Sequence, residues 1–190
     1  MYPQSVVHLE PFRTKEHIAV RKDGPERKSV FRNVSGYGNC PGTVVLPLSP
    51  QLNYFEIKII SKRSSNDCPE VGIGVGPSTY VLTCLPGWGQ DSVGYHSDDG
   101  KVYHSHPYSQ QRLGPTCTVE DVMGCGVVFE DLEGHAAVWF TKNGSVVGRP
   151  ERVRLLPEGL CFLFGSRHGG EAVLYLGHME WEPTGKCMSD

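Results

Sequence analysis

The stretch Leu85-Pro-Gly-Trp-Gly-Gln-Asp-Ser-Val-Gly-Tyr-His-Ser-Asp-Asp-Gly-Lys-Val-Tyr-His104 contains a loop, two segments that can extend, and a tight turn between them. Asp98, Asp99 and Gly100 favour the turn, because glycine accepts a positive φ and aspartate tolerates one. The pattern predicts a β-hairpin. Its Trp, Tyr, His and Asp side chains are also types found in active sites, so they could either catalyse or support a scaffold.

Short extended segments of this kind continue on both sides of the hairpin. We expect strands at residues 17–21, 28–33, 43–48, 53–60, 70–76, 123–129, 136–141, 145–147, 160–164 and 172–176. Asn143-Gly144 predicts a second hairpin, and the flanking Pro41 and Pro47 favour an edge position for residues 43–48. No stretch longer than about ten residues has the period of a core-facing helix. The sequence therefore predicts an antiparallel β-sandwich or barrel.

The clearest strand is Asn53-Tyr-Phe-Glu-Ile-Lys-Ile-Ile60. Phe55, Ile57 and Ile59 alternate with polar residues, which predicts one face on the core and one face, carrying Glu56 and Lys58, in water. Between the strands we expect a polar turn at residues 62–69 and irregular loops at residues 77–90 and 105–118.

Length and composition exclude several classes of function. The 190 residues suit one domain, and the net charge of −3 without a basic stripe argues against nucleic-acid binding. No apolar run approaches the length of a membrane span, and residues 1–12 lack a signal-peptide pattern. The seven scattered cysteines form no Cys-x-x-Cys pair, as expected for free thiols. We therefore expect a cytoplasmic or nuclear protein that is monomeric and contacts no membrane.

We considered whether the chain carries a metal site or a catalytic site. A metal could use ligands from the set His96, Asp98, Asp99, His104 and His106. However, the turn explains both aspartates, and Pro107 ends the strand that would align the last two histidines. The chain has neither a Gly-x-Ser-x-Gly motif nor a Walker A motif, and the glycine run 72–76 lacks dinucleotide-site spacing. We expect no enzyme activity, no cofactor and no metal.

The aromatic residues Trp88, Tyr95, Trp139 and Phe140 could form either core or a binding surface. Tyr95 and Phe140 lie inside expected strands, where burial of a large ring favours the core. Trp88 lies in a loop beside two glycines, so its role stays open.

Seven motifs in order carry a resemblance to a known family. They are Tyr54-Phe-Glu-Ile-Lys-Ile, Val71-Gly-Ile-Gly-Val, Leu85-Pro-Gly-Trp, Ser92-Val-Gly-Tyr-His-Ser-Asp-Asp-Gly, Asp121-Val-Met-Gly-Cys-Gly, Phe140-Thr-Lys-Asn-Gly and Gly170-Glu-Ala-Val. Together they resemble a SPRY (B30.2-type) domain, most of all its RanBPM-type branch. The resemblance implies an all-β fold, a bent antiparallel two-sheet sandwich of the concanavalin-like kind. It places the domain at residues 17–182, between a flexible N-terminal segment (1–16) and a C-terminal tail (183–190).

The resemblance also implies a function. SPRY domains are non-catalytic interaction modules, some of which recognise substrates or adaptors in ubiquitin-ligase or signalling assemblies. In peptide-binding relatives, loops equivalent to residues 34–42, 77–85 and 166–169 form a shallow groove for a short linear motif of a partner protein. Carried over, the groove residues are Ser35, Tyr37, Pro77, Tyr80, Val81, Leu82, Arg167, His168 and Gly169. The two tyrosines would supply contact area, and Arg167 would bind a ligand carboxylate or carbonyl.

Two other functions remain open at this point. The same sandwich could serve as a lectin-like frame that binds carbohydrate through its Tyr, Trp, Asp and His loops. It could also have a purely structural role in a larger protein.

Overall fold

A computed structural model describes residues 18–22, 28–33, 42–50, 52–61, 70–130, 134–167 and 171–176. Within these ranges every regular element is a β-strand, and no helix is long and apolar enough to cross a membrane. The strands are β1 (Ile18–Lys22), β2 (Lys28–Asn33), β3 (Gly42–Leu46), β4 (Tyr54–Ser61), β5 (Val71–Pro77), β6 (Val93–His96), β7 (Lys101–His104), β8 (Gln110–Arg112), β9 (Val122–Glu130), β10 (His135–Lys142), β11 (Ser145–Arg154), β12 (Leu160–Ser166) and β13 (Glu171–Leu176). The proposed segments 1–16 and 183–190 lie outside the described residues.

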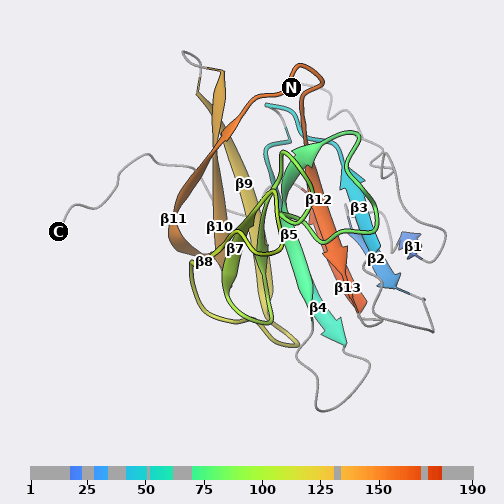
Figure 1. Cartoon of the computed structure of the whole chain (residues 1–190). Coiled ribbons are helices and arrows are strands. Elements are labelled where there is room, and N and C mark those ends of the chain that lie inside the picture. Colours follow the sequence, from blue (N-terminus) through green and yellow to red (C-terminus); the bar gives the residue numbers. More distant parts are fainter. Residues whose placement is uncertain are drawn as a thin grey trace, which may run out of the picture.

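The strands form two antiparallel sheets (Figure 1). The seven-stranded sheet has the order β1-β2-β13-β4-β9-β10-β11, and the six-stranded sheet has the order β3-β12-β5-β6-β7-β8. β3 is an edge strand, as the flanking prolines predicted. The expected all-β two-sheet architecture is therefore confirmed.

The main core lies between the two sheets. Phe55, Ile57 and Ile59 of β4 are fully buried, and the Phe55 ring packs on Phe162 of β12 with centroids 4.8 Å apart. Tyr95 and Phe140 are also buried and stack with centroids 5.6 Å apart, which confirms their assignment to the core. These contacts join strands that are far apart in sequence, so the alternating pattern of each strand finds its partner in the opposite sheet.

Both predicted hairpins are present. Gly100, with a φ of 66°, ends the turn between β6 and β7. Asn143 and Gly144 join β10 to β11 with φ values of 50° and 78°, the left-handed conformation that an Asn-Gly turn supplies. The Asn143 amide also accepts a hydrogen bond from the Val122 N–H and donates one to Asp121, both at 2.8 Å. This side chain ties the hairpin to the start of β9.

Three expectations need correction. Glu56 does not face water: it is 3% exposed, and its carboxylate accepts a 2.6 Å hydrogen bond from the Tyr54 hydroxyl, so the outer face of β4 is partly covered. The expected loop 105–118 contains β8, a short strand that pairs with β7. β11 continues past Pro150 to Arg154, because an edge strand tolerates a residue without an N–H.

Candidate functional site

The connection between β5 and β6, residues 78–92, lies over the outer face of the six-stranded sheet, and we call it the lid loop. Glycines on β5, β6 and β12 allow this close approach. A Cβ built on Gly94 would lie 2.2 Å from the Pro86 carbonyl oxygen, and one on Gly165 would lie 2.7 Å from the Pro86 Cδ. Any larger side chain at these positions would push the loop off the sheet, so the glycines are a physical requirement of the lid.

Tyr80 anchors the lid loop. It is 2% exposed and packs with Val45, Cys161 and Leu163 in a second, smaller core on this outer face. Its hydroxyl donates a 2.6 Å hydrogen bond to the Leu85 carbonyl and accepts a 2.9 Å hydrogen bond from the Gly89 N–H. Burial raises the pKa of Tyr80 to about 12, so the phenol is neutral at physiological pH. The groove role expected for its ring needs correction, because the ring points into the interior.

The residues after Tyr80 hold the lid loop against β3. The Leu82 carbonyl accepts a 3.0 Å hydrogen bond from the Thr43 N–H, and the Thr43 hydroxyl donates a 2.5 Å hydrogen bond to the Cys84 carbonyl. Val81, between the buried Tyr80 and the fixed Leu82, is 54% exposed. The loop therefore presents one apolar side chain to solvent from a firmly held backbone.

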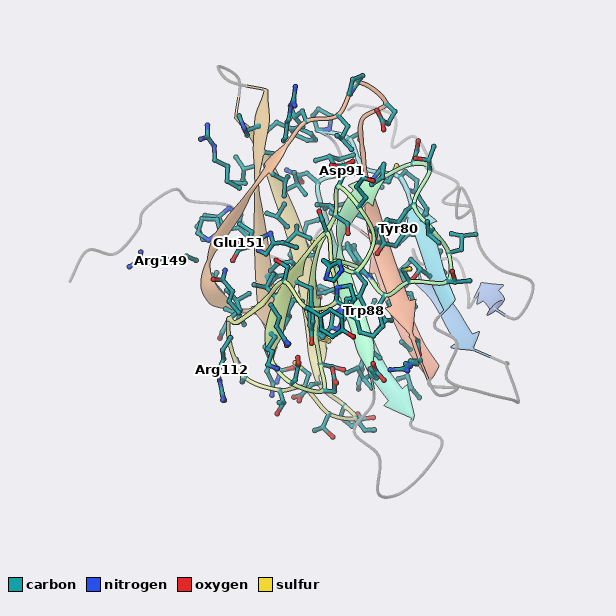
Figure 2. All side chains as sticks on the ribbon, in the orientation of Figure 1. Tyr80, Trp88, Asp91, Arg112, Arg149 and Glu151 are labelled. Carbon is teal, nitrogen blue, oxygen red and sulfur yellow. The ribbon has the colours of Figure 1, made fainter. Side chains whose placement is uncertain are left out.

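Trp88 of the same loop, labelled in Figure 2, belongs to an aromatic cluster with His96 of β6 and Tyr103 of β7. Its ring centroid lies 5.4 Å from that of His96 and 6.1 Å from that of Tyr103, and the Arg167 guanidinium carbon lies 5.8 Å from its ring centroid. The Arg167 Nη1 also contacts the two carboxylate oxygens of Glu70 at 2.9 and 3.2 Å. Trp88 and Glu70 thus fix the plane of the guanidinium.

Two titratable groups in and beside this cluster, His96 and Asp98, have shifted pKa values. Burial, followed by the negative charges of Asp99 and Glu70, raises the pKa of Asp98 to about 6. Burial lowers the pKa of His96, whose Nε2 lies 2.8 Å from the Pro86 carbonyl oxygen, so a neutral ring donates this hydrogen bond. The Tyr103 hydroxyl donates a 2.7 Å hydrogen bond to Asp99. These residues, which resembled an active site in the sequence, brace the lid loop.

The structure brings together only part of the predicted groove. Leu82 and Arg167 lie near the same end of the six-stranded sheet, because Leu82 bonds to Thr43 and Gly42 pairs with Ser166. Pro77 pairs with Leu160 at the opposite end of β5 and is buried, so it does not join them. Ser35, Tyr37, His168 and Gly169 lie outside the described residues.

Sequence reasoning left the role of Trp88 open and did not single out Glu70. The glycines on either side of Trp88 were the available signal, since they let the indole and its backbone approach the sheet. Glu70 gave no signal, because its role depends on Arg167, which is distant in sequence. We use the name lid face for Val81, Leu82 and Trp88 of the lid loop together with Arg167, which follows β12 and lies over the Trp88 ring.

The histidines and aspartates weighed as metal ligands do not form a site. His104 lies 3.2 Å from Glu151, and the His106 Nδ1 accepts a hydrogen bond from the Tyr108 N–H at 3.2 Å. In the ranges that the structure covers, no group of three or more His, Cys, Asp or Glu side chains could hold a metal ion. The cysteines described there, Cys84, Cys117, Cys125 and Cys161, are free thiols.

Comparisons with known proteins place this fold and surface in context. No family model matches the chain. It is 38% identical over 129 residues to SPRY domain-containing protein 3 of Homo sapiens, covering 67% of this chain and 28% of that protein. It is 40% identical over 128 residues to Ran-binding protein 9 of Xenopus tropicalis, covering 67% of this chain and 22% of that protein. The matched region is thus less than a third of either relative.

Solved structures agree with these relatives. A crystal structure of a human SPRY domain superimposes with a TM-score of 0.67 at 31% identity, covering 86% of this chain and 98% of that one. The SPRY domain of human HERC1 superimposes with a TM-score of 0.60 at 16% identity, covering 92% and 99% of the two chains, which supports the fold alone. The ordered motifs, the two-sheet sandwich and these similarities together show that the chain belongs to the SPRY domain family, a family of protein-interaction domains.

Proposed function

We propose that this chain is a non-catalytic interaction domain that binds a short extended segment of a partner protein on its lid face. The observation that carries the proposal is the exposure of Val81, at 54%, on a loop whose neighbouring residues are fixed. Most of the lid loop is held by hydrogen bonds and by the glycine-lined sheet. Little conformational entropy is then lost when a ligand binds, which favours affinity.

The chemistry of the lid face favours a ligand with an apolar residue. Glu70 already contacts the Arg167 guanidinium, so its charge is largely balanced before any ligand arrives. Val81 and the Trp88 ring offer apolar and aromatic area, and Trp, Tyr and Arg are the side chains that most often dominate binding energy. We infer that an apolar side chain of the ligand packs on Val81 and Trp88, while Arg167 orients the peptide backbone.

We also propose that the chain works in a substrate-recognition or signalling assembly, which fits its membership in a family of interaction domains. Carbohydrate binding is the alternative that the same loops would permit. A glycan array without hits, beside peptide display with a clear consensus, would decide for the peptide.

The test compares two exposed valines. Twelve-residue peptides are selected by display on the wild-type chain, and their affinities are measured by fluorescence anisotropy against Val81→Asp and Val128→Asp. Val128, on β9 of the other sheet, is 36% exposed and is the matched control. We expect Val81→Asp to weaken binding about tenfold or more and the control to leave it unchanged. Equal affinity for both variants would exclude the lid face.

A further inference from the structure

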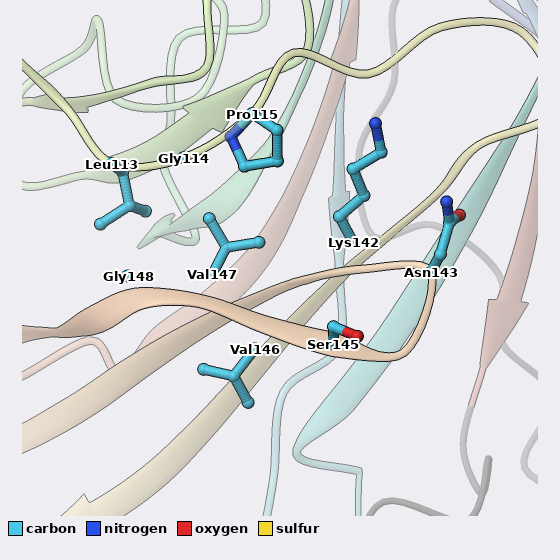
Figure 3. Close-up of a pocket in the computed structure, with 9 residues that line it drawn as sticks. All are labelled: Leu113, Gly114, Pro115, Lys142, Asn143, Ser145, Val146, Val147 and Gly148. Carbon is cyan, nitrogen blue, oxygen red and sulfur yellow. The ribbon is translucent and has the colours of Figure 1, made fainter. Parts of the chain in front are cut away.

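A hollow lies on the side of the sandwich where the edge strands β8 and β11 meet (Figure 3). Its volume is about 500 Å³, within the range of ligand sites. Leu113, Gly114 and Pro115 form one wall, and Lys142, Asn143 and residues 145–148 of the β10–β11 hairpin form the other. Leu113 points toward Gly148, and Val147 points toward Gly114 and Pro115 (Figure 3). None of these residues belongs to the lid face.

Both walls of the hollow are held in place. The N–H groups of Leu113 and Gly114 donate to the Gly100 carbonyl at 3.1 and 3.0 Å, and the buried Tyr95 hydroxyl donates to the Pro115 carbonyl. On the other wall, Lys142 donates a 2.8 Å hydrogen bond to the Thr116 carbonyl and pairs with Asp121 at 3.0 Å. Both walls are therefore fixed, and Leu113 and Pro115 supply the accessible apolar lining, because Val147 is 6% exposed and packs in the main core.

Two arginines flank one end of the hollow. Arg112 precedes Leu113 and Arg149 follows Gly148, and these two neighbours touch closely: a Cβ on Gly148 would lie 2.3 Å from the Leu113 Cδ1. Both arginines are exposed and project from this side of the molecule (Figure 2). The adjacent carboxylate, Glu151, is already bound by Gln111 at 3.1 Å and His104 at 3.2 Å.

Two guanidinium groups against the one adjacent carboxylate of Glu151 leave this end positive, on a chain whose net charge is −3. Lys142 adds little, because Asp121 balances it. In the described part of the chain, neither Arg112 nor Arg149 has an ion-pair partner. An arginine guanidinium binds carboxylates with strong, oriented hydrogen bonds, so the missing partners match an acidic ligand.

We propose that this hollow is a second binding site, for a short acidic segment of a protein partner. An apolar side chain of the segment packs against Leu113 and Pro115, and neighbouring carboxylates pair with Arg112 and Arg149. A nucleic acid is a poorer fit, because two cations beside an apolar hollow do not provide the array of phosphate contacts that such binding needs. The site is independent of the lid face and would let one domain hold two segments.

The experiment is a subtractive selection. Random twelve-residue peptides are selected for binding to the wild-type chain and depleted on the Arg112→Glu/Arg149→Glu variant, whose exposed side chains can change without disturbing the core. Enriched peptides are then measured against Arg149→Glu and against Arg154→Glu. Arg154 is the matched control, because it is an exposed arginine at the C-terminal end of β11, away from the hollow-lining residues 145–148.

We expect a consensus with two or more acidic residues beside an apolar one. Its affinity should fall about tenfold or more in Arg149→Glu, stay unchanged in Arg154→Glu and Val81→Asp, and weaken as salt is raised. Selection without a consensus, a consensus without acidic residues, or equal losses in Arg149→Glu and Arg154→Glu would overturn the proposal. If peptide affinity falls in Val81→Asp and not in Arg149→Glu, the selected peptides bind the lid face and the proposal of a second site is overturned.

Discussion

Replacing Tyr80 by phenylalanine removes one oxygen atom and tests how the lid loop is held. The ring still fills the small outer core, so the change removes only the contacts of the hydroxyl, among them the hydrogen bonds to the Leu85 carbonyl at 2.6 Å and from the Gly89 N–H at 2.9 Å. The Leu85 carbonyl keeps its 3.0 Å hydrogen bond from the Trp88 N–H, so the partly buried Gly89 N–H is the group that loses its partner. A buried polar group left without a partner costs about 1–3 kcal/mol.

We take about 2 kcal/mol as the expected loss in the free energy of unfolding for Tyr80→Phe. For a chain of this size, each kcal/mol corresponds to about 2–4 °C in the thermal midpoint, which predicts a decrease of about 4–8 °C. Urea unfolding gives the free energy directly. Hydrogen exchange measured by mass spectrometry should show faster exchange in the lid loop, because the Gly89 N–H loses its acceptor.

Tyr108→Phe is the matched control. Tyr108 is 84% exposed, so removal of its hydroxyl should leave the midpoint unchanged. If Tyr80→Phe behaves like this control in both unfolding and lid-loop exchange, Tyr80 is not the anchor and the account of the lid loop is wrong.

Three other changes probe the same surface. Gly94→Ala places a Cβ 2.2 Å from the Pro86 carbonyl oxygen, so we expect a loss of about 1–3 kcal/mol in urea unfolding together with faster exchange in the lid loop. Arg167→Ala removes the stacking on Trp88 and should weaken peptide binding about tenfold in anisotropy titrations. It should also lower the thermal midpoint, because the Glu70 carboxylate, whose side chain is 12% exposed, loses its charged partner. The pKa of Asp98 is about 6 in the folded chain and 3.8 in the unfolded chain, so protonation of this carboxyl stabilises the fold. The stabilisation is fully present below pH 3.8 and is lost as the pH rises through 6. Asp98→Asn should therefore raise the thermal midpoint at pH 7.5 and lose this gain at pH 4; an equal shift at both pH values would contradict the assignment.

Much of the fold was predictable from local pattern. The alternation of Phe55, Ile57 and Ile59 identified β4, and Asn143-Gly144 identified the β10–β11 hairpin, because both signals depend on neighbours in sequence. β8 escaped prediction, since a three-residue strand of Gln-Gln-Arg has no hydrophobic alternation and exists only by pairing with β7. The burial of Glu56 was not predicted for a related reason, because its hydrogen bond to Tyr54 leaves no periodic pattern in the sequence.

The candidate site was predictable only in outline. The sequence singled out residues 77–85 as a candidate binding loop, but it could not show that Tyr80 turns inward, because a loop tyrosine serves equally well as anchor or as contact surface. The roles of Trp88 and Glu70 depend on Arg167, which a different loop supplies. Such contacts between distant segments are decided by tertiary packing, and a single sequence does not contain them in readable form.

The central claim is that a rigid lid loop presents a peptide-binding face. Hydrogen exchange of the wild-type chain, with and without a saturating display-selected peptide that binds Val128→Asp but not Val81→Asp, tests this most directly. We predict protection in the lid loop and at Arg167, with unchanged exchange in β9 and β10. Protection confined to other strands, with the lid loop unchanged, would contradict the account.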